Sequence, residues 1–274
     1  MTDKSPAPKK PFYKDGRNKG KSGSWSKPGP RRPGLPPEGP VLLYGLHTVE
    51  AAFANPDRKR LKLYATENAQ RRLIEERGVK IDVPVETIMP RALDRMVTKD
   101  AVHQGMILEA DPLPAYGPEH LHGARLILAL DQVTDPHNVG AILRSAVALS
   151  ADAVVTTERH APEEGSVLAK SASGALDMIK HVRVKNMARF INEMSDQGFG
   201  CVALDSDGPN SLEETEFGDH TVLVLGSEGK GVRQGVREAC GQLARLDMPG
   251  EIRSLNVSNA AVLSLYVARQ KMGL

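Results

Sequence analysis

The stretch LDMPGEIRSLNVSNA, residues 246–260, contains the change of structure on which the fold prediction rests. It follows an apolar run at residues 242–246 that is typical of a buried strand. The pair Pro249-Gly250 ends this strand, because neither residue suits the interior of a strand or a helix. Polar loops after buried strands are common ligand sites in α/β proteins, so this loop is a candidate functional site.

A helix is predicted to follow the loop and to run to residue 268. Either Ser254 or Asn256 is placed to cap its first backbone amides. Apolar residues fall on nearly every face of this helix, which predicts that it is buried. Taken alone, the stretch equally fits an ordinary strand–loop–helix connection.

Short apolar runs recur throughout the second half of the chain. They lack the alternation of half-exposed strands, which favours strands covered on both faces. Helical patterns separate most of them, so a doubly wound parallel sheet is predicted. The predicted strands are residues 126–130, 153–156, 182–184, 201–204, 221–225 and 243–246, and the helices are residues 139–149, 187–194 and 232–240.

The preceding segment has the pattern of a smaller α/β unit. Residues 111–118 are rich in proline and have the composition of a linker. We therefore divide the chain into a tail at 1–39, a small α/β domain at 40–111, a linker at 112–123 and a large domain at 124–274. Within the small domain the predicted helices are residues 48–54, 68–76 and 92–97, and the predicted strands are residues 61–65 and 105–110.

Composition narrows the class of protein. The chain has 274 residues, of which 40% are hydrophobic, enough for the core of one large or two modest domains. It has no run of 18 apolar residues and no apolar segment near its start, so neither a membrane span nor a signal peptide is expected. Cys201 and Cys240 lack metal-ligand spacing and are expected to be buried thiols, which fits a reducing cytoplasm.

The charge is distributed unevenly. Residues 1–40 carry a net charge of +7, whereas the remaining residues carry −5. The tail has too few apolar residues to offset the entropy of ordering it, so it is predicted to be disordered. A cationic arm of this kind favours a polyanionic partner such as RNA, and a solubilising extension or a transit sequence is the alternative.

Two further motifs precede the opening stretch and give it a specific meaning. They are TDPHNVGAILRSA, residues 134–146, and LVLGSEGKG, residues 223–231. Together, and in this order, the three motifs resemble those of the SpoU/TrmH family of RNA ribose 2'-O-methyltransferases. The resemblance extends from about Gly45 to the end of the chain.

The resemblance implies an architecture, a cofactor and partners. The fold would be an α/β-knot with a deep trefoil knot, preceded by a small α/β RNA-binding domain. The cofactor would be S-adenosyl-L-methionine, held in the knot mainly by the backbone and lined by Gly226, Leu246 and Leu255. Methyl transfer is an in-line displacement that needs positioning and no metal. The resemblance also implies a homodimer, RNA as the partner and a cytoplasmic location.

The first motif supplies Asn138 and Arg144. Asn138 stands where a helix N-cap is expected, and an N-cap is its alternative role. Arg144 lies about 130° from the centre of the helix's apolar stripe, so it need not be buried, and a solvated arginine is its alternative role. The resemblance places both in the catalytic site. Because the pKa of a guanidinium is above about 12, we assign Arg144 to orienting the ribose and stabilising the alkoxide rather than to accepting the proton.

The second and third motifs add Glu228, Ser254 and Asn256. The second matches neither phosphate-binding glycine fingerprint, so it gives little support to nucleotide phosphate binding. Glu228 is a possible general base, a hydrogen-bond acceptor or a charge at a helix N-terminus. The resemblance places all three residues in the site. Two positions depart from the family pattern: Asp247, which stands near the cofactor loop, and Asn259, which adds a polar group beside the site.

The small domain carries its own signatures. YGLHTVE, residues 44–50, and HQGM, residues 103–106, match the opening and closing segments of the family's RNA-binding domain. KSASGA, residues 170–175, also resembles a family segment. Candidate RNA contacts are the basic residues Arg58, Lys59, Arg60, Lys62, Arg71 and Arg72, with ordinary solvated charges as the alternative.

The function implied is methylation of a ribose 2'-hydroxyl in RNA by S-adenosylmethionine. A guanosine of 23S ribosomal RNA is the expected substrate, because the subgroup that acts there has the most similar overall pattern. Methylation of transfer RNA is the alternative within the class. A catalytically silent RNA-binding ribosome-assembly factor is the alternative outside it, and the presence of all five candidate catalytic residues argues against that reading.

Overall fold

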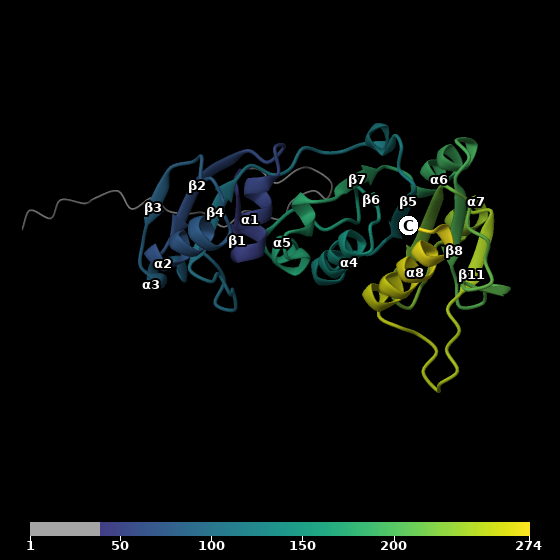
Figure 1. Cartoon of the computed structure of the whole chain (residues 1–274). Helices are drawn as coiled ribbons and strands as arrows, with labels where there is room; N and C mark the ends of the chain where they lie inside the picture. The colour runs from purple at the N-terminus through teal and green to yellow at the C-terminus, as the bar shows by residue number, and fades with distance from the viewer. Residues whose placement is uncertain (1–38) are drawn as a thin grey trace, which may run out of the picture. The chain divides into compact units, whose positions relative to one another are not determined.

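A seven-stranded sheet forms the larger part of the structure, a computed structural model that describes residues 39–274. The strands lie in the order β7-β6-β5-β10-β8-β11-β9, and every neighbouring pair is parallel, which confirms the predicted parallel sheet (Figure 1). The strands are β5 (Leu126–Asp131), β6 (Ala153–Thr157), β7 (Lys180–Val184), β8 (Gly200–Leu204), β9 (Asn210–Ser211), β10 (Thr221–Gly226) and β11 (Gln242–Arg245).

Helices cover both faces of this sheet. The helices are α4 (Pro136–Ala148), α5 (Ser166–Ala172), α6 (Met187–Asp196), α7 (Gln234–Ala239) and α8 (Val257–Met272). Buried side chains of α4, α5 and α8 pack on one face of the sheet, against residues such as Leu128 and Leu223. Those of α6 and α7 pack on the other face, against residues such as Ile127 and Val222. The central strands are thus buried on both sides, as their uninterrupted apolar runs predicted.

A second, four-stranded sheet is built from the segment before the linker. Its order is β1-β4-β2-β3, with β2 parallel to β3 and the other pairs antiparallel. Its elements are β1 (Val41–Tyr44), α1 (Leu46–Ala54), β2 (Arg60–Ala65), α2 (Glu67–Arg71), β3 (Val85–Thr87), α3 (Pro90–Leu93) and β4 (Met106–Ala110). The sequence patterns did not predict β1, β3 or α5.

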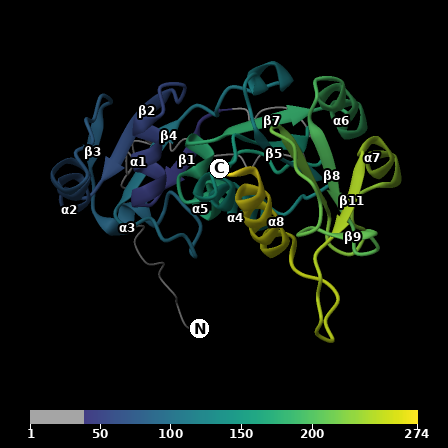
Figure 2. The same ribbon diagram turned by 45° about the vertical axis from the view of Figure 1, so that its right-hand side comes forward.

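The loop between β11 and α8, residues 246–256, extends away from the sheet and is the longest yellow loop in Figures 1 and 2. It contains the Pro249-Gly250 pair, so the predicted strand–loop–helix order is confirmed. Asn256 is the N-cap of α8, where its side-chain oxygen accepts a hydrogen bond from the Ser258 amide at 2.9 Å. Of the two residues predicted for this cap, Ser254 is therefore not the one used.

Helix α8 corrects the expectation that it is buried on nearly every face. Val257, Ala261 and Leu265 are buried, but Leu263 and Tyr266 are 46% and 53% exposed. Val262 is also partly exposed, so apolar side chains form a stripe on the outer face of the helix. The sequence pattern correctly indicated a helix without a polar face. Part of this apolar surface is nevertheless exposed, because no other segment of residues 39–274 packs on it.

Three further expectations concerned the cysteines, a membrane span and the tail. Cys201 and Cys240 are buried free thiols, as expected, and burial raises the pKa of Cys201 to about 11. None of the helices in residues 39–274 is long and apolar enough to cross a membrane. The predicted tail, residues 1–39, falls outside the described residues except for Gly39.

Candidate active site

A cavity of about 340 Å³ lies where three neighbouring strands end. Its walls are residues 204–207 after β8, residues 225–231 at the end of β10, and residues from the loop before α8. The carboxyl ends of parallel strands share one edge of the sheet, which is why these loops meet. Three residues assigned to the cofactor line this cavity, and two assigned to catalysis join them; they are Gly226, Leu246 and Leu255, with Glu228 and Ser254.

Gly226 is required by the path of its own loop. A Cβ atom at this position would lie 1.9 Å from the carbonyl carbon of Gly231, so no other residue fits without a shift of the backbone. The loop doubles back because the Gly231 amide donates to the Ser227 carbonyl at 2.9 Å. Gly229 and Gly231 have φ values of 77° and 64°, which glycine adopts without strain. The glycines of this motif therefore shape the cavity wall.

A buried ion pair anchors the far end of the same loop. Asp131, at the end of β5, is fully buried, and its carboxylate accepts hydrogen bonds from the Arg233 guanidinium at 2.7 to 3.0 Å. The Arg233 backbone amide also donates to Asp131, at 3.0 Å. These hydrogen bonds raise the pKa of Arg233. The sequence reasoning did not single out either residue, although an aspartate at the end of an apolar strand is a recognisable signal.

Side chains from all three motifs meet at Glu228. Its Oε1 atom accepts hydrogen bonds from Asn256 Nδ2 at 2.6 Å and from Asn138 Nδ2 at 3.4 Å, and from the Val257 amide at 3.4 Å. Asn256 Nδ2 also donates to Asn138 Oδ1 at 3.1 Å. Glu228 thus accepts hydrogen bonds from two other motifs in this structure. We call Asn138, Glu228 and Asn256 the motif network.

Asn138 is available for this network because it is not the helix cap. Asp135 is the N-cap of α4, its side chain accepting from the His137 amide at 2.9 Å, and Pro136 occupies the first helical position. The prediction that Asn138 stands at the cap was wrong by one turn. Two acceptable caps, Asp135 and Asn138, occur in the same short segment, and spacing alone does not choose between them.

Arg144 stands apart from the motif network. It is exposed on α4, as its position away from the apolar stripe predicted, and it makes no hydrogen bond or ion pair with another residue of the described chain. It lies six residues after Asn138, about 9 Å further along the helix and on a different face. Contacts with the part of the chain that the structure describes therefore do not restrain its guanidinium.

The cavity walls carry charges of both signs. The acidic side chains Asp205 and Asp207 lie on the β8 side, and Lys230 and Arg253 come from the two other loops. Arg237 pairs with Asp205 at 2.6 Å. Carboxylates beside apolar residues suit a ligand that carries both a cationic centre and hydroxyl groups.

The two departures from the family pattern lie outside the motif network. Asp247 forms an ion pair with Arg245 at 2.8 Å on the surface. Asn259 is exposed on α8 and does not enter the motif network. Across residues 39–274, no group of three or more histidine, cysteine, aspartate or glutamate side chains is arranged to hold a metal ion.

Most of the basic cluster of the small sheet is paired with acidic residues, and the burial of Arg58 corrects its interpretation as an RNA contact. Arg58 is 1% exposed and pairs with Asp177 at 2.7 Å and with Glu164. The others are paired at the surface: Lys59 with Asp111, Arg60 with Asp82, and Lys62 with Glu86. Arg71 and Arg72 bond only residues of their own helical segment.

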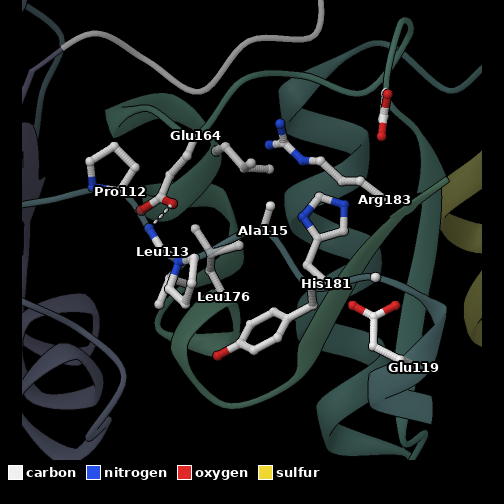
Figure 3. Close-up of a pocket in the computed structure, with 13 residues that line it drawn as sticks. Pro112, Leu113, Ala115, Glu119, Glu164, Leu176, His181 and Arg183 are labelled. Atoms are coloured by element: carbon white, nitrogen blue, oxygen red, sulfur yellow. Dashed lines mark hydrogen bonds between the residues drawn. The ribbon is translucent and has the colours of Figure 1, made fainter. Parts of the chain in front are cut away.

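Beside Arg58, a second cavity of about 250 Å³ lies under the linker (Figure 3). The Glu164 carboxylate accepts a hydrogen bond from the Leu113 amide at 2.8 Å, drawn as a dashed line, and its other oxygen bonds Arg58. His181 and Arg183 lie side by side on β7 at the opposite wall. Arg58 thus joins the small sheet, the linker and the large sheet in one buried ion cluster.

Comparison with known proteins assigns this architecture to a class. A family model described as the SpoU rRNA Methylase family matches residues 125–266, and one described as RNA 2'-O ribose methyltransferase substrate binding matches residues 42–116. The chain therefore belongs to the SpoU rRNA methylase family, as the three motifs predicted. It is an S-adenosylmethionine-dependent RNA ribose 2'-O-methyltransferase.

Individual relatives are similar over most of the chain. A protein of Pseudomonas aeruginosa named 23S rRNA (guanosine-2'-O-)-methyltransferase RlmB is 35% identical over 84% of this chain and 96% of its own. The RlmB protein of Vibrio cholerae is 31% identical over 84% of this chain and 97% of its own.

Solved structures support the fold. The SpoU methyltransferase AviRb from Streptomyces viridochromogenes, solved with AdoMet, matches with a TM-score of 0.73 at 23% identity, covering 85% of this chain and 91% of its own. An AdoMet-bound rRNA methyltransferase from Sinorhizobium meliloti matches with a TM-score of 0.71 at 22% identity, covering 84% and 87% respectively.

Proposed function

We propose that the protein methylates the ribose 2'-hydroxyl of a guanosine in 23S ribosomal RNA. The observation that carries this proposal is the similarity to relatives named 23S rRNA (guanosine-2'-O-)-methyltransferase RlmB, which covers more than four-fifths of this chain. Transfer RNA is the alternative substrate, since a relative named a putative TrmH family tRNA/rRNA methyltransferase is 33% identical over 78% of this chain. We divide the chain at the boundaries predicted above, with the small domain at 40–111 and the methyltransferase domain at 124–274.

The cofactor site that we propose is the cavity at the ends of β8, β10 and β11. Gly226, Leu246 and Leu255 would hold S-adenosylmethionine there, and the acidic side chain of Asp205 or Asp207 would face its polar groups. The bound cofactor supplies an electrophilic methyl group on a sulfonium. We infer that the loop after β11 passes the glycine loop as a trefoil knot, and the shared cavity walls support this inference.

The roles of the catalytic residues follow from their contacts. We assign to Asn138, Glu228 and Asn256 the task of holding the three motifs together, because they bond one another between the first turn of α4, the loop after β10 and the N-cap of α8. Ser254 would present its hydroxyl beside the cavity. Arg144, which has no partner in the described chain, would orient the ribose and stabilise the developing alkoxide.

Binding of S-adenosylmethionine separates an enzyme from a silent scaffold. Isothermal titration calorimetry on the wild type should detect binding of the cofactor, and Leu255→Arg should abolish it. The added cation would enter the cavity wall and repel the sulfonium. A wild-type protein that does not bind the cofactor would instead favour the RNA-binding assembly factor.

We also propose that the protein is a cytoplasmic homodimer. The support for the dimer is the apolar stripe on α8, formed by the exposed side chains of Val262, Leu263 and Tyr266. Exposed apolar stripes of this kind mark interaction surfaces. The support for the cytoplasm is the pair of buried free thiols and the ribosomal substrate proposed above.

A further inference from the structure

Lys170 is a partly buried cation that has no anionic partner within residues 39–274. It lies in the last turn of α5, and burial lowers its pKa. Its Nζ atom lies 5.9 Å from the centre of the Tyr44 ring and makes no hydrogen bond or ion pair with any residue in 39–274. By contrast, the buried or half-buried guanidinium groups of Arg58 and Arg233 both pair with carboxylates. A shielded cation that lacks a counter-charge is unfavourable unless a ligand supplies one.

The signature segments of the small sheet leave space for this ammonium group. A Cβ atom on Gly45 would lie 2.6 Å from Lys170 Nζ and 3.1 Å from Gln104 Oε1, so a side chain at this position would displace the ammonium group. Gln104 Oε1 accepts a hydrogen bond from the Leu46 amide at 2.8 Å, which joins the opening and closing segments. Two motifs that are 60 residues apart in sequence therefore meet at Lys170.

The residue that follows Lys170 in the sequence, Ser171, contacts the first motif. Ser171 Oγ lies 3.2 Å from His137 Nδ1, in the first turn of α4. Gly140 allows the close approach of α5, since a Cβ there would lie 2.4 Å from the Ser171 side chain. His137 and Arg144 are seven residues apart and so share one helix face, about 10 Å apart along the axis. The surface from Lys170 to His137 thus leads towards Arg144.

We propose that Lys170, together with Ser171 and His137, forms a binding subsite for an RNA backbone phosphate near the target nucleotide. This proposal rests on the proposed function, because it places a neighbouring phosphate of the same RNA strand. An ammonium group binds phosphate as a compact point charge, and a hydroxyl group and an imidazole add hydrogen bonds. Two carboxylates of the adjoining elements are already engaged: Asp135 caps α4 by accepting from the His137 amide at 2.9 Å, and Glu50 lies 3.8 Å from His47 and 3.9 Å from Arg77.

Phosphate is favoured over an acidic protein partner by where the subsite lies. It lies between the segment that matches the RNA substrate-binding model and the helix that carries Arg144. Contacts to phosphate position an RNA strand without reading its sequence. The subsite would therefore fix the register of the strand while other residues select the guanosine.

The test compares Lys170→Met, Lys170→Arg and the control Lys185→Met, which removes an exposed lysine from the turn between β7 and α6. Binding to an in vitro transcript of 23S rRNA is measured by fluorescence anisotropy at several salt concentrations. Lys170→Met should weaken binding about tenfold, the effect of one charge-assisted hydrogen bond. It should also reduce the salt slope by about 0.7 to 0.9. Lys170→Arg should retain most of the affinity, and Lys185→Met should match the wild type.

The outcomes separate this inference from the proposed function. Cofactor affinity, measured by calorimetry, should be the same in all three variants, which shows that the site is still folded. If Lys170→Met keeps the wild-type affinity and salt slope while the wild type transfers methyl groups, the phosphate subsite is wrong and the proposed function stands. A lower affinity with an unchanged slope would show a structural role and overturn the subsite. A wild type without methyl transfer would remove the proposed function and this inference with it.

Discussion

At the scale of single residues, the candidate site contains three residues that are hydrogen-bonded to one another and one, Arg144, that has no hydrogen bond or ion pair within residues 39–274. Glu228, Asn256 and Asn138 bond one another and join the loop after β10 to the N-terminal ends of α8 and α4, so these contacts form without RNA. Arg144 is exposed and has no partner in residues 39–274. A long cation without protein partners is suited to contacts that form only when the substrate is present.

The role of Arg144 predicts a specific result for conservative substitution. Arg144→Lys keeps the charge but loses the planar fork that can hold a ribose oxygen and a phosphate together. We expect turnover at saturating RNA and cofactor to fall by about 100-fold or more in both Arg144→Lys and Arg144→Ala. Cofactor affinity should be unchanged in both variants. Near-wild-type turnover of Arg144→Lys would show that a point charge is sufficient.

His181 predicts a dependence of stability on pH. It is 7% exposed, its Nε2 lies 2.9 Å from Thr156 Oγ1, and burial, with a smaller contribution from the charge of Arg183, lowers its pKa to about 3. The imidazole thus stays neutral in the folded protein, whereas in the unfolded chain it takes up a proton below about pH 6.5. The unfolded state binds more protons, so stability is lost as the pH falls from about 6.5 towards 3.

The corresponding measurement is urea unfolding at pH 7 and pH 5. His181 should account for about 2 kcal/mol of the stability lost between these two values. His181→Gln keeps a hydrogen-bonding group beside Thr156. Between pH 7 and pH 5 this variant should lose about 2 kcal/mol less unfolding free energy than the wild type. Equal losses in the variant and the wild type would contradict a neutral buried imidazole.

At the scale of elements, the sequence predicted what depends on local pattern. The uninterrupted apolar runs of β5 and β10 indicated strands covered on both faces, and they pair in parallel at the centre of the sheet. The three motifs led to Gly226, Leu246 and Leu255, which line one cavity. These results required only periodicity, breakers and motif order.

What could not be predicted depends on partners distant in the chain. Arg58 stands in a basic cluster that indicated a surface, but Asp177 and Glu164, more than 100 residues away, make it a buried ion cluster. The motif network joins Asn138 to Asn256 over 118 residues. The outer face of α8 is apolar and exposed within residues 39–274. A local sequence pattern indicates that a face is apolar but not whether another part of the chain packs on it.

Arg58 predicts the cost of breaking that ion cluster. Arg58→Met would leave the carboxylates of Asp177 and Glu164 buried without their counter-charge, so we expect a loss of about 3 to 5 kcal/mol in the free energy of unfolding. Lys59→Met is the matched control. Its ammonium is 75% exposed and pairs with Asp111, so the loss should be below about 1 kcal/mol. Urea unfolding that gives equal losses for the two variants would contradict the cluster's contribution to stability.

At the scale of the whole molecule, charge and exposed apolar surface point to different partners. The +7 charge of residues 1–40 favours an arm that contacts RNA, whereas the rest of the chain is slightly acidic. The apolar stripe of α8 favours another protein surface. A second copy of the chain would cover this stripe and lie near both cofactor sites.

The dimer predicts the mass of the protein in solution. Sedimentation equilibrium at micromolar concentration should give about twice the 29.6 kDa of one chain. Leu263→Arg and Tyr266→Arg place charges in the exposed stripe and should shift the equilibrium towards the monomer, because an unpaired charge would be buried at the interface. Arg253→Ala, in the exposed loop before α8, is a control expected to leave the dimer intact. A wild-type monomer would exclude the proposed dimer.

Methyl transfer to ribosomal RNA is the measurement that tests the central claim most directly. The purified protein is incubated with labelled S-adenosylmethionine and a transcript of 23S rRNA, and the RNA is digested to nucleosides for mass spectrometry. We predict a single labelled product, 2'-O-methylguanosine, which Arg144→Ala does not form. Label on a base, or no label on RNA by a protein that binds the cofactor, would contradict ribose 2'-O-methylation.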